Sequence, residues 1–143
     1  MDVSFLDKIQ RYFGKSKVKP EQYSSLALAY IGDGVFDLVV RTIILDLGNG
    51  KVREFHKKTS NIVKAPSQAR IIKSVLNELT EEERVVYKRA RNTKSATSAK
   101  NSSIVDYRVA TGFEALIGYL YLNNRLDRAL DIIKQGMERE GFL

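Results

Sequence analysis

Residues 26–40 read LALAYIGDGVFDLVV, and this stretch decides the fold. Apolar residues continue on both sides of it, so the segment from Ser24 to Leu47 leaves almost no polar face on a helix. A helix that is apolar all round is buried, either by its own domain or by a second subunit. The tripeptide Gly-Asn-Gly at 48–50 follows, and its residues accept the left-handed dihedral angles that end a helix. The segment therefore predicts a long buried helix.

Three further segments repeat apolar residues with helical spacing. They span residues 71–79, 113–121 and 126–137. Thr80 and Glu83 have the spacing of a capping box, which predicts a new helix from Glu81, and Gly141 stands where the last helix should stop. No stretch alternates for long with the period of two that is typical of strands. The sequence therefore predicts an all-α fold of about six or seven helices.

Length and composition narrow the class of protein. A chain of 143 residues fits one domain of ordinary size, so we expect a single domain over residues 1–143. Lys and Arg total 24 against 17 Asp and Glu, a net charge of +7 that fits either a nucleic-acid partner or a generic basic surface. The absence of Cys excludes disulfides and thiolate zinc sites, and one His excludes paired-histidine ribonuclease chemistry within a subunit. With no signal peptide or membrane-length apolar run, we expect a cytoplasmic protein.

Asp33 is the most informative single residue. It lies among apolar residues, and burying an unpaired carboxylate costs several kcal/mol. The flanking Gly32 and Gly34 are poor helix formers, which makes sense if a ligand or a partner helix approaches the backbone closely. The alternatives are an Asp that pairs with an Arg and an Asp that caps a broken helix.

Glu114 is the second candidate. It lies between Phe113 and Leu116 on an apolar stripe, beside the small residues Ala110 and Gly118. Taken alone, it is better explained as a Glu at the edge of the stripe that faces water. Together with Asp33, however, it offers the hard oxygen ligands that Mg²⁺ or Mn²⁺ accepts. A carboxylate-held metal is the most economical hydrolytic machinery for a chain without Cys and with one His.

One loop also stands out. Residues 92–103 read NTKSATSAKNSS, and loops of this length inside compact domains are often functional. Arg89 and Arg91 precede or border it, and it contains Lys94 and Lys100. A basic loop rich in hydroxyl groups can contact phosphates, although a solvated connection would have the same composition.

Other polar residues have simpler explanations. Asp37 and Arg41 lie four residues apart and most simply form an ion pair. His56 is more simply a structural or surface histidine than a catalyst, and the adjacent Lys57 and Lys58 are either solvated or in contact with phosphate.

At this point the chain resembles a known family. Residues 26–40 resemble the ribonuclease III signature, in which an apolar helix carries a Gly-Asp pair, and FEALIGYLYL at 113–122 resembles the family's second motif. HKKTSNIVKAPSQA at 56–69 and KRARNTKSATSAKN at 88–101 look like the corresponding stretches of Mini-III enzymes. The order and separation of the motifs agree, and the resemblance covers roughly residues 22–138, the expected core.

The resemblance implies a homodimer that cuts double-stranded RNA and leaves 5′-phosphate and 3′-hydroxyl ends. Asp33 matches the signature Asp and Glu114 the metal-binding Glu, so both are expected to be catalytic and to bind Mg²⁺, for which Mn²⁺ can substitute. By family analogy the substrate is precursor 23S ribosomal RNA in a bacterium, with possible help from ribosomal proteins. The residues expected to bind RNA are Arg89, Arg91, Asn92, Lys94, Lys100, Lys57, Lys58 and Arg70.

The chain also departs from ordinary ribonuclease III. Ala29 and Thr111 stand where two further acids are usual, which leaves a second metal undecided, although Mini-III proteins share this reduced set. One expected helix follows Glu114, which leaves no room for the usual C-terminal RNA-binding domain. The alternatives are a noncatalytic double-stranded-RNA-binding protein with a decayed site and a helical DNA-binding regulator. Retention of both acids favours the nuclease.

Overall fold

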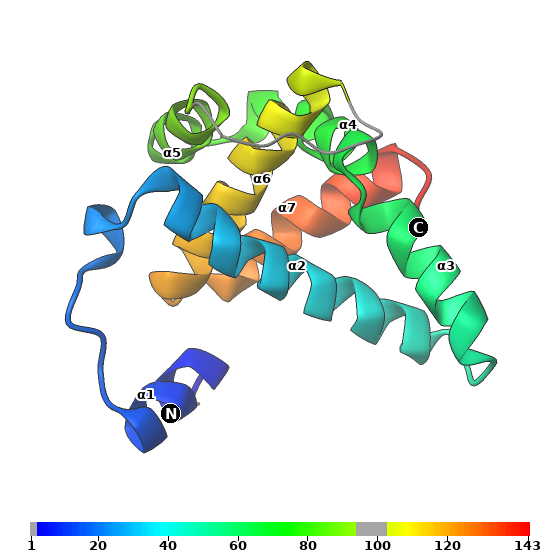
Figure 1. Ribbon diagram of the computed structural model, residues 1–143, viewed down its shortest axis with the longest axis horizontal. Coiled ribbons are helices and arrows are strands. Elements are labelled where there is room, and N and C mark those ends of the chain that lie inside the picture. Colours follow the sequence, from blue (N-terminus) through cyan, green and yellow to red (C-terminus); the bar gives the residue numbers. More distant parts are fainter. Residues whose placement is uncertain (1–2, 94–102) are drawn as a thin grey trace.

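The fold, seen in a computed structural model that describes residues 3–93 and 103–143, is helical (Figure 1). Within these ranges the chain forms seven α-helices and two short 3₁₀ helices and has no strand. The predicted all-α fold of six or seven helices is therefore confirmed. No helix in the described ranges is long and apolar enough to span a membrane. The helices are α1 (Phe5–Phe13), η1 (Pro20–Gln22), α2 (Ser25–Asp46), α3 (Val52–Val63), α4 (Ala65–Val75), η2 (Leu76–Glu78), α5 (Glu81–Arg91), α6 (Ile104–Leu122) and α7 (Leu126–Arg139).

Helices α2 and α6 make the most extensive contact in the fold. They touch through their backbones at two glycines. A Cβ atom on Gly32 would fall on the carbonyl oxygen of Glu114, and one on Gly118 would fall on the carbonyl oxygen of Leu28. Any larger residue at either position would force the helices apart, so glycine is required at both.

The core lies around this crossing. Phe36 of α2 and Phe113 of α6 pack edge to face, with ring centroids 5.0 Å apart, a geometry that aromatic pairs favour. The apolar stripes of α4 and α7 cover α6 from the other side. Complete burial of one such aliphatic or aromatic side chain contributes roughly 1.5–3 kcal/mol. The most deeply buried large side chains are Tyr87, Phe36, Phe113, Ile71, Ile72, Leu116, Ile117, Leu120, Ile132, Ile133, Met137 and Val40.

Several helix ends lie where the sequence predicts them. The side chain of Ser24 accepts a hydrogen bond from the backbone of Ala27 at the start of α2, and Gly48 follows its end with a φ of 134°. The capping box of α5 is present, with the Thr80 amide donating to Glu83 Oε1 at 2.9 Å. Gly141 has a φ of 77° just past α7, which is the left-handed conformation that ends helices.

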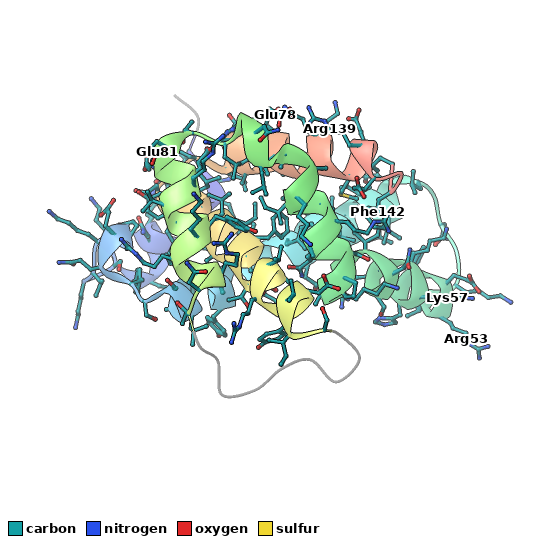
Figure 2. The ribbon with its side chains drawn as sticks, turned by 90° about the horizontal axis from the view of Figure 1, so that it is seen from above. Arg53, Lys57, Glu78, Glu81, Arg139 and Phe142 are labelled. Carbon is teal, nitrogen blue, oxygen red and sulfur yellow. The ribbon has the colours of Figure 1, made fainter. Side chains whose placement is uncertain are left out.

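Ion pairs join α7 to the first turn of α5 and to η2. Arg128 donates to both carboxylate oxygens of Glu83, at 2.8 and 2.9 Å, and the Glu83 side chain is only 3% exposed. Arg139 pairs with Glu78 at 2.6 Å on the same edge of the molecule (Figure 2). A bidentate pair with one buried partner holds its two helices more firmly than a solvated pair does.

The expectation that the whole circumference of α2 is buried is not met within one chain. One face packs into the core, through Leu28, Phe36, Val40 and Ile44. The opposite face leaves large apolar side chains exposed, and these are Leu26, Tyr30, Leu38, Leu45 and, just after the helix, Leu47. One apolar face is enough to pack a helix on a core. The packing of this chain therefore does not explain why the exposed face of α2 is also apolar.

The glycines beside Asp33 give a matched test of the helix crossing. We expect Gly32→Ala to destabilise the protein by roughly 1–3 kcal/mol or more, because the added methyl group meets backbone that cannot yield. Gly34 has open space around it, so Gly34→Ala should be neutral or stabilise by up to about 1 kcal/mol through helix propensity. Urea unfolding of the two variants measures this difference, and equal stabilities would contradict the close approach.

Candidate active site at the helix crossing

Asp33 and Glu114 meet where α2 crosses α6. Gly32 touches the backbone of Glu114, so the residue after Gly32 on α2 stands beside the Glu114 side chain. Asp33 is close enough to raise the pKa of the Glu114 carboxyl group. The structure thus brings together the two acids that the sequence singles out, although they come from different helices.

The burial of the two acids is the reverse of what the sequence suggests. Asp33 is exposed, whereas Glu114 is partly buried. Successive helix residues are rotated by about 100°, so Gly32 faces α6 while Asp33 points past the crossing toward solvent. The expectation of a buried Asp33 is therefore wrong, and Glu114 keeps only part of its side chain in contact with solvent. Gly118, a small neighbour of Glu114 along α6, lies at the crossing itself, where a Cβ atom would meet Leu28 O.

Gln68 completes the surroundings of Glu114. It lies on α4, is 2% exposed, and its Nε2 donates to Val63 O at 2.8 Å and to Glu114 Oε2 at 3.4 Å. Sequence reasoning missed this residue. The signal was present, since Gln68 occupies the first position of the stripe that continues with Ile71, Ile72 and Val75. An amide at a core position of a helix needs a polar partner.

The surroundings of Glu114 raise the pKa of its carboxyl group to about 8. Burial is the largest cause, because it penalises the charged form. A hydrogen bond to Asp33 and the charge of Asp33 raise the pKa further, and the hydrogen bond from Gln68 opposes them. With a pKa of about 8, the Glu114 carboxyl group is mostly protonated near neutral pH. Two carboxyl groups that cannot both ionise readily are poised to accept a cation.

The donor set at the crossing consists of these two acids. Ala29, at a position where ordinary ribonuclease III carries an acid, is buried, and the Thr111 hydroxyl donates to Tyr107 O at 2.9 Å. In residues 3–93 and 103–143 no three His, Cys, Asp or Glu side chains gather as a larger metal-binding cluster. Mg²⁺ commonly uses only one or two carboxylates and completes its shell with water and phosphate oxygens, so this pair fits it.

The basic side chains expected to bind RNA do not form one cluster. Lys57 and Lys58 are exposed on α3, and Arg89 is exposed on α5. These two helices lie on opposite sides of α6 in both views (Figures 1 and 2). Lys94 and Lys100 lie outside the described residues.

Three further expected RNA contacts have partners within the chain. The Arg91 guanidinium stacks over the Tyr87 ring and donates to Asn92 Oδ1 at 3.2 Å. Arg70 donates to Glu140 Oε1 at 3.0 Å and lies over the ring of Phe142. Binding RNA through Arg70 would require these contacts to be released.

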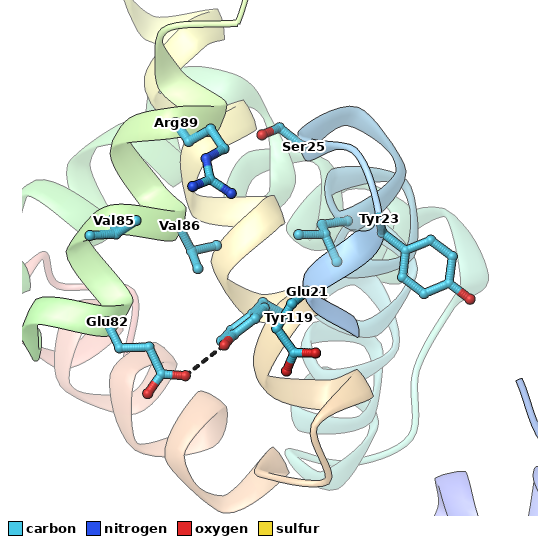
Figure 3. Close-up of a pocket in the computed structure, with 9 residues that line it drawn as sticks. Glu21, Tyr23, Ser25, Glu82, Val85, Val86, Arg89 and Tyr119 are labelled. Carbon is cyan, nitrogen blue, oxygen red and sulfur yellow. Dashed lines mark hydrogen bonds between the residues drawn. The ribbon is translucent and has the colours of Figure 1, made fainter. Parts of the chain in front are cut away.

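A pocket of about 300 Å³ lies between η1, the start of α2, α5 and α6, apart from the two acids (Figure 3). Most of its lining is apolar. At one end Tyr119 donates to Glu82 at 2.6 Å, and Arg125 also pairs with Glu82. Arg89 lines the other end. Neither Asp33 nor Glu114 lines this pocket, so the hollow and the candidate chemistry are separate features.

Comparison with known proteins gives first the class. Residues 26–125 match the Ribonuclease III domain. The chain is 48% identical over 130 residues to the Mini-ribonuclease 3 of Clostridium tetani, covering 88% of this chain and 86% of that relative. It is 42% identical over 123 residues to the Mini-ribonuclease 3 of Enterococcus faecalis, covering 85% and 93%. The crystal structure of protein FN1578 from Fusobacterium nucleatum matches with a TM-score of 0.75 at 34% identity, covering 83% and 95%.

The chain therefore belongs to the ribonuclease III family, and within it to the Mini-ribonuclease 3 group. The expected family and the expected enzyme class, an endoribonuclease of the ribonuclease III type, are confirmed.

The raised pKa of Glu114 predicts how stability depends on pH. The folded protein holds this proton up to about pH 8, whereas the unfolded chain releases it near the ordinary value of 4.5. The group's contribution to stability is therefore complete below 4.5 and is lost as the pH rises toward 8. At about 1.4 kcal/mol per pKa unit the loss amounts to a few kcal/mol.

Glu114→Gln should remove this loss. We expect the variant to gain stability relative to the unsubstituted protein between pH 5 and 9 in EDTA, as measured by urea unfolding. The exposed Asp37, which pairs with Arg41 at 2.7 Å as predicted, gives a control in Asp37→Asn, which should show no such gain. If the free energy of unfolding depended on pH in the same way for the Glu114 variant and the unsubstituted protein, the raised pKa of Glu114 would be contradicted.

Proposed function

We propose that this protein is a metal-dependent endonuclease that hydrolyses phosphodiester bonds in double-stranded RNA and leaves 5′-phosphate and 3′-hydroxyl ends. The observation that carries the proposal is the meeting of Asp33 and Glu114 at the crossing of α2 and α6. Both acids belong to segments that resemble the family's motifs. In this proposal Asp33 and Glu114 are the catalytic and metal-binding residues.

The proposed cofactor is Mg²⁺, with Mn²⁺ as a substitute. Asp33 and Glu114 would hold it through their carboxylate oxygens, and Glu114 must first give up its proton. A cation held there would supply Lewis-acid chemistry, polarising a phosphate group and easing the ionisation of water. Neither acid then has to act as a general base. The exposed Asp33 leaves one side of the pair open to a phosphate group, whereas the buried Glu114 is fixed by its neighbours.

Substitution of either acid tests the proposal. Asp33→Asn and Glu114→Ala should lower the cleavage rate of a labelled RNA duplex in Mg²⁺ by at least about a thousandfold, while RNA binding in EDTA changes little. Asp37→Asn, on the same helix but away from the crossing, should cut normally.

The substrate controls for this assay are single-stranded RNA and duplex DNA, which should remain intact. Full cleavage by either variant would refute the assignment of the acids. Tight duplex binding by the unsubstituted protein without any cleavage would favour the alternative, a noncatalytic RNA-binding relative.

RNA recognition is proposed to come from this catalytic fold itself. A-form RNA is recognised through its phosphates and 2′-hydroxyl groups, because its major groove is too deep and narrow for side chains. The exposed side chains of Lys57, Lys58 and Arg89 offer charge on both sides of the crossing. The full proposed set is Arg89, Arg91, Asn92, Lys94, Lys100, Lys57, Lys58 and Arg70.

Salt dependence separates true phosphate contacts from surface charge. The double variants Arg89→Gln/Arg91→Gln and Lys57→Gln/Lys58→Gln should each flatten the plot of log affinity against log salt, by about one unit for each phosphate that the variant no longer neutralises. Lys8→Gln/Arg11→Gln on α1 removes the same charge and should leave the slope unchanged. A slope that responds equally to all three pairs would mean that only net charge matters.

The proposed assembly is a homodimer in which each subunit cuts one strand. A groove of about 520 Å³ between α2 and α7 is almost entirely apolar. On its rim, Leu38 is 54% exposed and Leu130 is 38% exposed. A self-complementary interface between two copies would cover this surface, as in most symmetric oligomers.

Sedimentation at micromolar concentration should therefore find a dimer. Leu38→Glu should shift it to monomer, because a buried unpaired carboxylate is costly. Val85→Glu, a similar change at an exposed residue of α5, should leave the dimer intact. A monomeric unsubstituted protein would contradict the proposed assembly.

We further propose that the physiological substrate is the precursor of 23S ribosomal RNA and that the protein acts in ribosome biogenesis in a bacterial cytoplasm. The support is family resemblance and the bacterial origin of the relatives. Ribosomal proteins on the precursor could help to present the duplex.

A further inference from the structure

Gln68 is the strongest feature that the proposed mechanism has not used. Its side chain is 2% exposed, yet it lies next to the candidate active site. Across the described residues, its Oε1 atom is the one buried side-chain nitrogen or oxygen without a hydrogen-bond partner. A buried acceptor left without a donor costs about 1–3 kcal/mol, so a position that only served packing would favour an apolar residue.

The orientation of the Gln68 amide follows from its neighbours. Nε2 lies 2.8 Å from the carbonyl oxygen of Val63, which can only accept a hydrogen bond. The amide nitrogen must therefore face Val63, and an amide turned the other way would set two acceptors against each other. The second N–H of the same nitrogen is directed to Glu114 Oε2 at 3.4 Å. Both donors are thus assigned, and Oε1 remains as an acceptor.

We propose that Gln68 is a positioning residue for the candidate metal site, which ties the Glu114 carboxylate to the junction of α3 and α4 and offers Oε1 to a hydrogen-bond donor bound there. The proposal rests on the proposed function of Asp33 and Glu114. Val63 is the last residue of α3, so its carbonyl fixes the amide in space. The amide in turn limits the rotation of the Glu114 side chain.

The long contact of 3.4 Å between Gln68 Nε2 and Glu114 Oε2 fits this role. A hydrogen bond of ordinary strength has a donor–acceptor distance of about 2.7–3.2 Å, and catalytic contacts often tighten only when the ligand is bound. An amide N–H stabilises the charged carboxylate, and here it opposes the influences that keep Glu114 protonated. Removal of a group that hydrogen-bonds to a metal ligand commonly changes the metal affinity by about 10–100-fold.

Ser67 provides a matched control. It precedes Gln68, is equally buried at 2% exposure, and its Oγ donates to Asn61 O at 2.6 Å. Like Gln68, it braces the junction of α3 and α4, but its hydrogen bond goes to the backbone of α3 and not to Glu114. A loss that arises only from loosening this junction should appear in Ser67→Ala as well.

The experiment is a titration of the full-length protein with Mn²⁺, followed by electron paramagnetic resonance of the free ion. Gln68→Met keeps the length of the side chain without its donors, and Gln68→Asn keeps an amide that is too short to span both partners. We expect each to raise the Kd for Mn²⁺ by about 10–100-fold, and Ser67→Ala to leave it within about threefold.

Cleavage assays add a second readout. In Gln68→Met the Mg²⁺ concentration for half-maximal cleavage should rise by a similar factor, and the rate at saturating Mg²⁺ should largely recover. A merely structural role would instead lower the rate at every Mg²⁺ concentration. If Gln68→Met does not fold, as judged by circular dichroism, the Asn variant decides the question.

The outcomes separate the two proposals. If the unsubstituted protein binds Mn²⁺ and Asp33→Asn abolishes this binding, the metal site stands. An unchanged Kd in a folded Gln68 variant then overturns the role of Gln68 alone, and so does an equal loss in Ser67→Ala. If the unsubstituted protein binds no Mn²⁺ at millimolar concentration with or without an RNA duplex, the proposed metal site and the role of Gln68 fail together.

Discussion

The backbone contact between α2 and α6 is the constraint on which the other features depend. Gly32 and Gly118 allow the two helices to approach until peptide groups touch. This approach sets the position of Phe36 against Phe113 in the core, and it sets Asp33 beside Glu114 at the surface of the crossing. The packing of the core and the placement of the two acids therefore depend on the same contact between helices.

The remaining helices hold that crossing in place from two sides. On one side, the neighbouring α5 residues Glu82 and Glu83 have different partners. Glu82 accepts hydrogen bonds from Tyr119 and Arg125, and Glu83 accepts them from Arg128. These contacts link α5, α6 and α7. On the other side α4 brings Gln68 against Glu114. The buried acid is thus supported by the core and by an amide, and only Asp33 faces the solvent directly.

Local signals in the sequence were enough to predict α2, the start of α5 and much of α4, α6 and α7, and to single out the two acids, but they did not predict α1 or α3. Ser24, Thr80 with Glu83, and Gly141 act within one helical turn, so their effect can be read without knowledge of the fold. The pairing of Asp33 with Glu114 needed more, namely the resemblance of both motifs to one family. The ion pair of Asp37 and Arg41 depended only on their spacing along one helix.

The burial of the acids and the role of Gln68 could not be predicted in this way, because both depend on which face of each helix meets its neighbour. A shift of one residue in the point of contact would have buried Asp33 and exposed the glycine. The sequence contained the polar residue at the head of the α4 stripe, but no local pattern specifies that its partner lies on α6. The partial burial of α2 likewise depends on how much surface one chain can cover.

The contact at Gly32 also limits how this protein can evolve or be engineered. Glycine-to-alanine exchange in helices is a common route to greater heat resistance, and here Gly34 has open space for a methyl group whereas Gly32 has none. The oxygen that a methyl group on Gly32 would meet belongs to the peptide of Glu114 itself. An alanine that stiffened α2 at this position would thus displace the backbone of Glu114, so a change made for stability would move the proposed metal ligand.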